Sequence, residues 1–187
     1  MTNKAYTLIE VLVAISIFFI VIAAPTGFFV GSLKGQQKAL ASQVLLDNVS
    51  YNLEYISRAI RMAKKDLAGD CIEEDSNYEN PGHNISKIRF LNYHGYCQEF
   101  LLNNDRLGVR MSPDANEENL GEFLPLTPAN LEIESVKFQL SGQEQEDDFQ
   151  PQATIFLKIK GRGLRPELQP EIEIQTTISQ RNLDVMY

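Results

Sequence analysis

The chain begins with a short polar segment, followed by an apolar run without a charged residue from Val11 to Leu33. Glu10 stands directly before this run and Lys34 directly after it. A membrane-spanning helix needs roughly 20 mainly apolar residues, so the pattern predicts such a helix over residues 6–33. A carboxylate moved to the centre of a bilayer costs about 2.5–3.5 kcal/mol. A helix that only anchors the protein therefore does not explain the presence of Glu10. Pairing of Glu10 with a charge on another molecule does explain it.

Beyond Gly35 the apolar residues recur every three or four positions, the period of a helix with one buried face. Gly69 ends the pattern, and Lys64 and Lys65 fall in the expected last turns, where they suit the helix dipole. The pattern predicts an amphipathic helix over residues 34–68 that packs on its own sheet, with a coiled-coil seam as the alternative. The apolar stripe consists of Leu46, Val49, Leu53, Ile56, Ile60, Ala63 and Leu67.

Residues 69–187 have the pattern of a globular, β-rich head. Apolar Val136 and Phe138 alternate with polar Lys137, for example, which fits an antiparallel sheet with one solvated face. The amphipathic helix would cover the other face, so the predicted fold class is α+β, with a long N-terminal helix on an antiparallel sheet. The expected strands are 87–93, 98–102, 106–111, 133–140, 153–159 and 172–178, with a turn at 103–105 and a polar connection over 112–128.

The formal charge of −8 over 187 residues makes nucleic acid an unexpected partner, because backbone binding needs clustered lysine and arginine. A local basic patch is the exception that the sequence allows, and it would comprise Lys158, Lys160, Arg162 and Arg165.

Catalytic patterns are weak. His83 and His94 lie in or beside polar turns, and neither Ser112 nor Ser141 has the context of a nucleophile elbow. We therefore expect no catalytic residue, no enzyme activity and no cofactor.

The start of the chain carries a more specific pattern. Lys4 and the small residue Ala5 precede Tyr6-Thr-Leu-Ile-Glu10 and the apolar run, which resembles the class III signal of type IV pilins and pseudopilins. In that family a prepilin peptidase cuts between the small residue and the following aromatic and the new N-terminus is methylated. The resemblance implies a leader over residues 1–5, cleavage between Ala5 and Tyr6, N-methylation of Tyr6, and Glu10 as the assembly glutamate. Ala5 and Tyr6 replace the family's usual glycine and phenylalanine.

The resemblance also implies partners and location. It predicts a structural subunit of a type IV pilus or type II secretion-like filament, with other pilin or pseudopilin subunits, the prepilin peptidase, the cytoplasmic membrane and the assembly platform as partners. Lys4 agrees with a cytoplasmic N-terminus, which puts the head outside the cytoplasm and later on a pilus or filament. Pro25 and Gly27 would mark a helix kink, used in assembly or without a role. Diffuse likenesses in the head suggest a minor pilin or J-type pseudopilin.

Other interpretations are open at this point. A plain signal anchor would keep its leader, and an ordinary secretory signal would be cut near Ala24. The head could also be a filament-tip adhesin or DNA-binding module. Some major pseudopilins bind calcium in a head loop, and the acidic run Glu144–Asp148 offers Asp147 and Asp148 as candidate ligands; a solvated loop tip is the alternative.

The two cysteines, Cys71 and Cys97, both lie beyond the membrane segment. With the head outside the cytoplasm they meet an oxidising space, where a disulfide is expected. A bridge closing a loop of about 25 residues stabilises by about 3 kcal/mol. Metal binding is the alternative, without a CxxC pair to support it.

Overall fold

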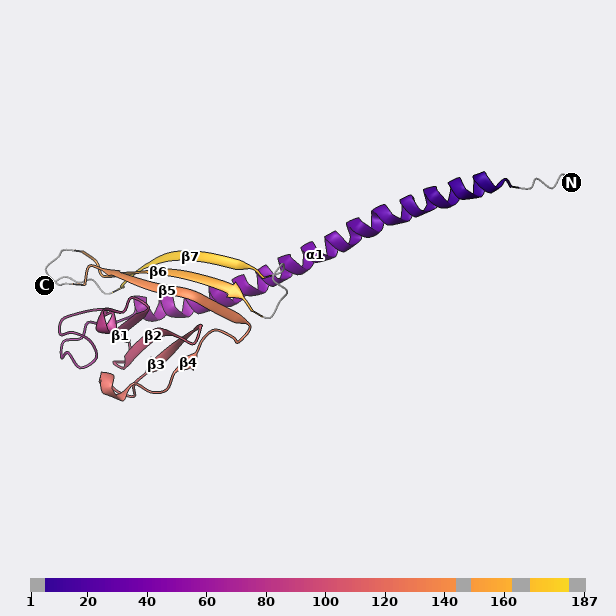
Figure 1. The fold of residues 1–187 in the computed structure, drawn as a ribbon. Helices are drawn as coiled ribbons and strands as arrows, with labels where there is room; N and C mark the ends of the chain where they lie inside the picture. The colour runs from indigo at the N-terminus through magenta and orange to yellow at the C-terminus, as the bar shows by residue number, and fades with distance from the viewer. Residues whose placement is uncertain (1–5, 144–148, 163–168, 182–187) are drawn as a thin grey trace. The chain divides into compact units, whose positions relative to one another are not determined.

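The structure is a computed structural model that describes residues 6–143, 149–162 and 169–181 (Figure 1). It contains two compact units, Met1–Leu40 and Ala41–Tyr187. Helix α1 (Leu8–Arg61) contributes to both, and the described residues of the second unit form seven strands and two 3-10 helices. The predicted α+β class, a long helix with an antiparallel head, is confirmed.

The described part of the first unit comprises Tyr6, Thr7 and the N-terminal part of α1. Every side chain described from Tyr6 to Leu40 is exposed, although most of them up to Leu33 are apolar. Two of its hydroxyl groups bond within the helix: Ser16 Oγ donates to the Leu12 carbonyl at 2.8 Å, and Thr26 Oγ1 donates to the Ile22 carbonyl at 2.7 Å. This part of α1 is long and apolar enough to cross a membrane.

Pro25 lies inside α1, and the helix continues through it. A Cβ added at Gly27 would meet no atom within 4 Å. The kink at Pro25 and Gly27 stays a prediction. A membrane helix can accommodate a proline where neighbouring helices satisfy the carbonyl that the proline leaves unbonded.

In the second unit, α1 buries a stripe that differs from the predicted one. Leu45 is buried in place of Leu46, which is 47% exposed, and Leu67 lies beyond the helix and is 71% exposed. The buried members of the stripe are Leu45, Val49, Ile56 and Ile60, with Leu53 partly buried against them.

The predicted helix end at residue 68 is wrong, because α1 ends at Arg61. Groups from distant parts of the head take the last carbonyls. Tyr78 Oη donates to the Ile60 carbonyl at 2.9 Å, and the Arg181 N–H donates to the Arg61 carbonyl at 2.8 Å. Lys64 then pairs with Leu91 as an isolated bridge. These tertiary bonds replace those of a further helical turn, so periodicity alone could not place the end.

The strands form two antiparallel sheets rather than the single sheet of the prediction. The first has the order β1-β2-β3-β4 and the second the order β5-β6-β7. Their bounds are β1 Lys87–Leu91, β2 Cys97–Asn103, β3 Arg106–Met111, β4 Leu124–Pro125, β5 Leu131–Ser141, β6 Gln152–Gly161 and β7 Glu171–Ser179. The 3-10 helices are η1 (Pro81–His83) and η2 (Glu117–Asn119).

The predicted turn between β2 and β3 is confirmed. Asn104 and Asp105 have φ values of 49° and 58°, which a two-residue hairpin loop requires. The connection over residues 112–128 contains η2 and the short strand β4, which pairs with Gly108 and Val109 of β3. A Cβ at Gly108 would lie 2.3 Å from the Phe123 ring, so glycine is needed for this close approach.

One hydrophobic core joins the end of α1 to both sheets. Aromatic rings connect the helix to the first sheet: Tyr55 contacts Phe100 with centroids 5.9 Å apart, Phe100 contacts Phe90 at 5.8 Å, and Phe90 contacts Tyr78 at 6.4 Å. The second sheet contributes Phe138 and other inward residues to the same core. α1 is therefore the element on which both sheets are built.

Asp66 organises the loop that follows α1. Its side chain is buried, and its carboxylate accepts four backbone N–H bonds, from Ala68 and Gly69 at 3.1 Å, Cys71 at 2.8 Å and Ile72 at 3.2 Å. A buried charge is tolerated when it is hydrogen-bonded in this way.

The same loop places Cys71 against β2, where it forms a disulfide with Cys97, 26 positions along the chain, with 5.3 Å between the Cα atoms. The expected disulfide is confirmed. Both cysteines are buried and form a small second apolar cluster with Ile72.

The substitution Asp66→Asn should destabilise the head by about 2–4 kcal/mol, because an amide nitrogen would face backbone donors that need an acceptor. Urea unfolding of the full chain in detergent, followed by near-UV circular dichroism, measures the change. Asp70→Asn is the matched control, since Asp70 is exposed in the same loop, and it should cost less than about 0.5 kcal/mol. Equal losses in the two variants would contradict this role of Asp66.

Candidate functional site

The first turn of α1 is capped by Thr7. The Glu10 N–H donates to the Thr7 carbonyl at 3.1 Å and lies 3.4 Å from Thr7 Oγ1, and the Val11 N–H also reaches the Thr7 carbonyl. A threonine in this position satisfies a donor that the helix leaves unpaired. Thr7 and Glu10 also have the spacing of a capping box, a local signal that the prediction from sequence did not use.

Glu10 is exposed in the first turn of α1, where the helix dipole favours a negative charge. Tyr6 lies four residues before it, just ahead of α1. Together with Val11, Ile15 and Phe18, Tyr6 and Glu10 line a shallow groove. The structure thus places the predicted methylation residue and the predicted assembly residue at the same end of one apolar helix. Ala5, on the other side of the predicted cleavage, lies outside the described residues.

The large apolar side chains at the start of α1 are exposed, among them Leu8, Val11, Leu12, Ile15 and Phe19. None of the other residues that the structure describes covers them, since this stretch has no buried position. Apolar surface on this scale is unfavourable in water, so the site is suited to a lipid or to the apolar surface of other helices.

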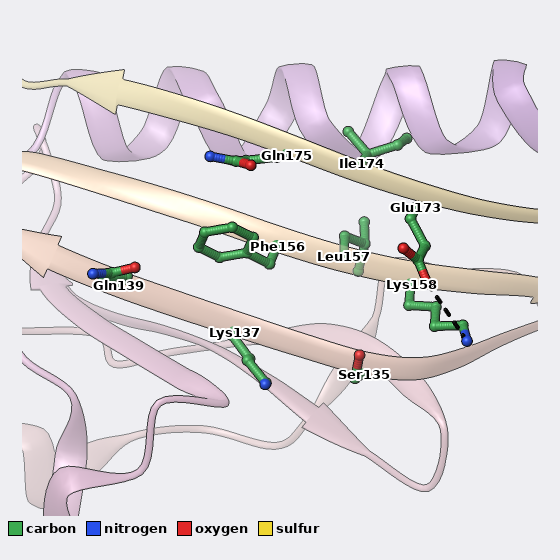
Figure 2. Close-up of a pocket in the computed structure, with 9 residues that line it drawn as sticks. All are labelled: Ser135, Lys137, Gln139, Phe156, Leu157, Lys158, Glu173, Ile174 and Gln175. Atoms are coloured by element: carbon green, nitrogen blue, oxygen red, sulfur yellow. Dashed lines mark ion pairs between the residues drawn. The ribbon is translucent and has the colours of Figure 1, made fainter.

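Figure 2 shows Lys158, one residue of the predicted basic patch, on the second sheet beside Glu173. Lys158 Nζ lies 2.8 Å from a carboxylate oxygen of Glu171, 3.1 Å from one of Glu134 and 3.5 Å from one of Glu173. These contacts raise the pKa of Lys158, with the hydrogen bond to Glu171 as the largest cause. The same hydrogen bond lowers the pKa of Glu171.

Arg162 is neutralised in a similar way, with a nitrogen 3.2 Å from Asp105 and another 3.2 Å from Glu132. Lys158 and Arg162 therefore do not form the predicted basic patch, and Arg165 lies outside the described residues. These cations are close together in the sequence, which suggested a basic patch. In the structure, strand pairing places carboxylates of β5 and β7 beside Lys158.

The remaining candidates do not come together. Asp147 and Asp148 lie outside the described residues, so calcium binding there stays a prediction. In residues 6–143, 149–162 and 169–181 no group of three or more histidine, cysteine and acidic side chains is arranged to hold a metal. Ser112 Oγ accepts the Cys97 N–H at 3.0 Å and also bonds the Asp114 carbonyl, which is a structural use.

The contacts of Lys158 predict a pH dependence of stability. The pKa of Glu171 in the folded protein lies below its ordinary value of 4.5, so the pair contributes fully above about pH 4.5 and is lost as pH falls through the folded pKa. Unfolding midpoints measured between pH 7 and pH 3 should fall more steeply for the wild type than for Lys158→Met. Lys137→Met, on the neighbouring strand β5, should follow the wild-type profile; parallel profiles for all three proteins would contradict the assignment.

Comparison with known proteins identifies the N-terminal segment. Residues 1–24 match the family model described as the prokaryotic N-terminal methylation motif. No curated protein and no solved structure matches the chain. The match includes the predicted cleavage position, Glu10 and most of the apolar run, which confirms the resemblance inferred from the sequence. The chain therefore carries the N-terminal methylation motif of type IV pilins and pseudopilins, at the start of a helix that is long and apolar enough to span a membrane.

Proposed function

We propose that the protein is a minor pilin or pseudopilin, a structural subunit that assembles through α1 into a type IV pilus or type II secretion-like filament. The observation that carries this proposal is the methylation motif at residues 1–24, joined to a helix whose described side chains up to Leu40 are all exposed. A helix of this kind needs an apolar environment that the described part of the chain does not provide.

Processing and topology follow from the same proposal. A prepilin peptidase cuts between Ala5 and Tyr6 and the new N-terminus on Tyr6 is methylated. Before assembly the helix anchors the subunit in the cytoplasmic membrane, with its N-terminus in the cytoplasm and the head outside. The disulfide between Cys71 and Cys97 supports this topology, because disulfides persist in oxidising compartments.

Glu10 is proposed to set the register between subunits. Cleavage releases an α-amino group on Tyr6, and packing of the helices removes water from around Glu10. An unpaired carboxylate in such surroundings is unfavourable. An amino group of a neighbouring subunit about 4 Å away would attract it by roughly 4 kcal/mol at an effective dielectric constant near 20. The apolar side chains then supply cohesion, and the ion pair selects the offset between helices.

Two alternatives lead to different expectations. A DNA-binding tip needs a basic surface, and the neutralised Lys158 and Arg162 count against it. A signal-anchored domain that never assembles would be indifferent to the charge of Glu10.

Besides the prepilin peptidase and the cytoplasmic membrane, the proposed partners are neighbouring pilin or pseudopilin subunits and the assembly platform.

Glu10→Gln separates a role in assembly from a role in helix capping. Glutamine can replace glutamate in a capping box, but it carries no charge. We expect Glu10→Gln, like Glu10→Ala and Glu10→Val, to leave the monomer in the membrane and to lower its incorporation into filaments by about tenfold or more. Immunoblots of the membrane and sheared-filament fractions, from cells with the complete assembly machinery, measure both quantities.

Thr7→Ala is the matched control for this experiment. It removes the side-chain cap, at about 1 kcal/mol, and keeps the carboxylate, so incorporation should remain close to that of the wild type. Normal incorporation of Glu10→Gln, together with a defect in Thr7→Ala, would show that Glu10 acts as a cap and would contradict the proposed ion pair.

A further inference from the structure

A hollow of ≈ 630 Å³ opens on the head between the end of α1, the connection from β1 to β2, and β3. We call it the tyrosine hollow. Its walls are formed chiefly by Tyr55, Met62, Tyr93, His94, Tyr96 and Met111. The volume falls in the range of small-molecule binding pockets. All the lining residues belong to the second unit, so the hollow is a feature of the head itself.

The aromatic rings of the hollow are exposed, and those of Tyr93, His94 and Tyr96 contact one another. The ring of His94 lies 3.7 Å from that of Tyr93 and 5.9 Å from that of Tyr96, between centroids. Tyr93 is 51% exposed, and large apolar side chains gathered at one exposed place indicate a binding surface. Tyr55 also contacts Phe100 of the core, whereas Tyr93, His94 and Tyr96 line the hollow from the connection between β1 and β2.

A buried amide beneath the rings lacks a partner. Gln98 Oε1 accepts from Asn92 Nδ2 at 3.1 Å, and Asn92 Oδ1 accepts the N–H groups of His94 and Tyr96 at 3.0 Å each. Gln98 Nε2 has no acceptor among the described residues. Exchanging the two ends of the Gln98 amide would place nitrogen against nitrogen, so the donor is fixed. The nitrogen is buried, so a ligand oxygen can serve as its acceptor only after the side chains that cover it have shifted.

The hollow carries little net charge. Its lining includes Arg58, and the guanidinium of Arg58 lies 2.5 Å from a carboxylate oxygen of Glu54. The remaining polar groups are tyrosine hydroxyls, amides and the imidazole of His94. The apolar side chains of the lining are tyrosines, Met62, Met111 and Ala59. The chemistry suits an uncharged ligand that has both apolar faces and several oxygen atoms.

We propose that the tyrosine hollow binds a neutral carbohydrate, with the C–H faces of the sugar rings against Tyr93 and Tyr96, and that the side chains over Gln98 Nε2 shift so that a sugar oxygen becomes its acceptor. An acetamido sugar fits best, because its carbonyl is a strong acceptor and its methyl group can contact Met62 or Met111. This proposal does not depend on filament assembly, since it concerns the folded head alone.

The methionines allow a direct test. The chain has four methionines, and two of them, Met62 and Met111, line the hollow. We would label the full chain in detergent micelles with methionine that carries 13C in its methyl group. It would be titrated with N,N′-diacetylchitobiose, with cellobiose and with N-acetyltryptophanamide. The proposal expects saturable shifts of the Met62 and Met111 methyl signals with diacetylchitobiose, weaker ones with cellobiose, and no such response of Met1 and Met186.

Tyr93→Ala should weaken diacetylchitobiose binding about tenfold. Tyr51→Ala is the matched control, because Tyr51 is an exposed tyrosine of α1 that does not line the hollow, and it should bind as the wild type does. The absence of a saturable shift with either disaccharide, or a shift that Tyr93→Ala leaves unchanged, would overturn the proposal. Binding of N-acetyltryptophanamide alone would also overturn it and would indicate a site for a protein side chain.

Discussion

The structure depends on one constraint, which is the apolar surface of α1. The helix is continuous from Leu8 to Arg61, but its two parts are covered differently. From Leu45 onward one stripe is buried under the two sheets of the head, whereas every described side chain up to Leu40 is exposed. Burial of apolar surface is the main favourable term in folding and association. The first part of α1 therefore needs a membrane or other helices, and its methylation motif agrees with that need.

The head is attached to the other part of α1 by contacts that are distant in sequence. Tyr78 and Arg181 donate to the carbonyls of Ile60 and Arg61 at the end of the helix, and Gln180 Nε2 donates to the carbonyl of Ala63, just beyond it, at 2.8 Å. Asp66 and the disulfide then fix the loop that leaves the helix. Since these bonds join the start of the head to its last described strand, the helix end is held by the whole head rather than by its own sequence.

The sequence predicted the features that follow from local pattern. The long helix, the hairpin at Asn104 and the methylation signal needed only periodicity, turn chemistry or a motif, and the disulfide needed only the expected oxidising compartment. The helix end at Arg61, the burial of Leu45 rather than Leu46, and the division into two sheets depend on tertiary contacts. The basic patch failed for the same reason, because strand register placed Glu134 and Glu171 beside Lys158. The tyrosine hollow combines residues from three elements and has no local sequence signal.

The most direct test of the account is the mass of the N-terminus. The full chain would be produced together with a prepilin peptidase, and intact and peptide mass spectrometry would locate the first residue and any methyl group. The account predicts a mature chain that begins at N-methylated Tyr6, because the resemblance of residues 1–24 to the class III signal implies a cut between Ala5 and Tyr6. A chain that keeps residues 1–5 beside an active peptidase, or one that begins beyond Ala24, would contradict it.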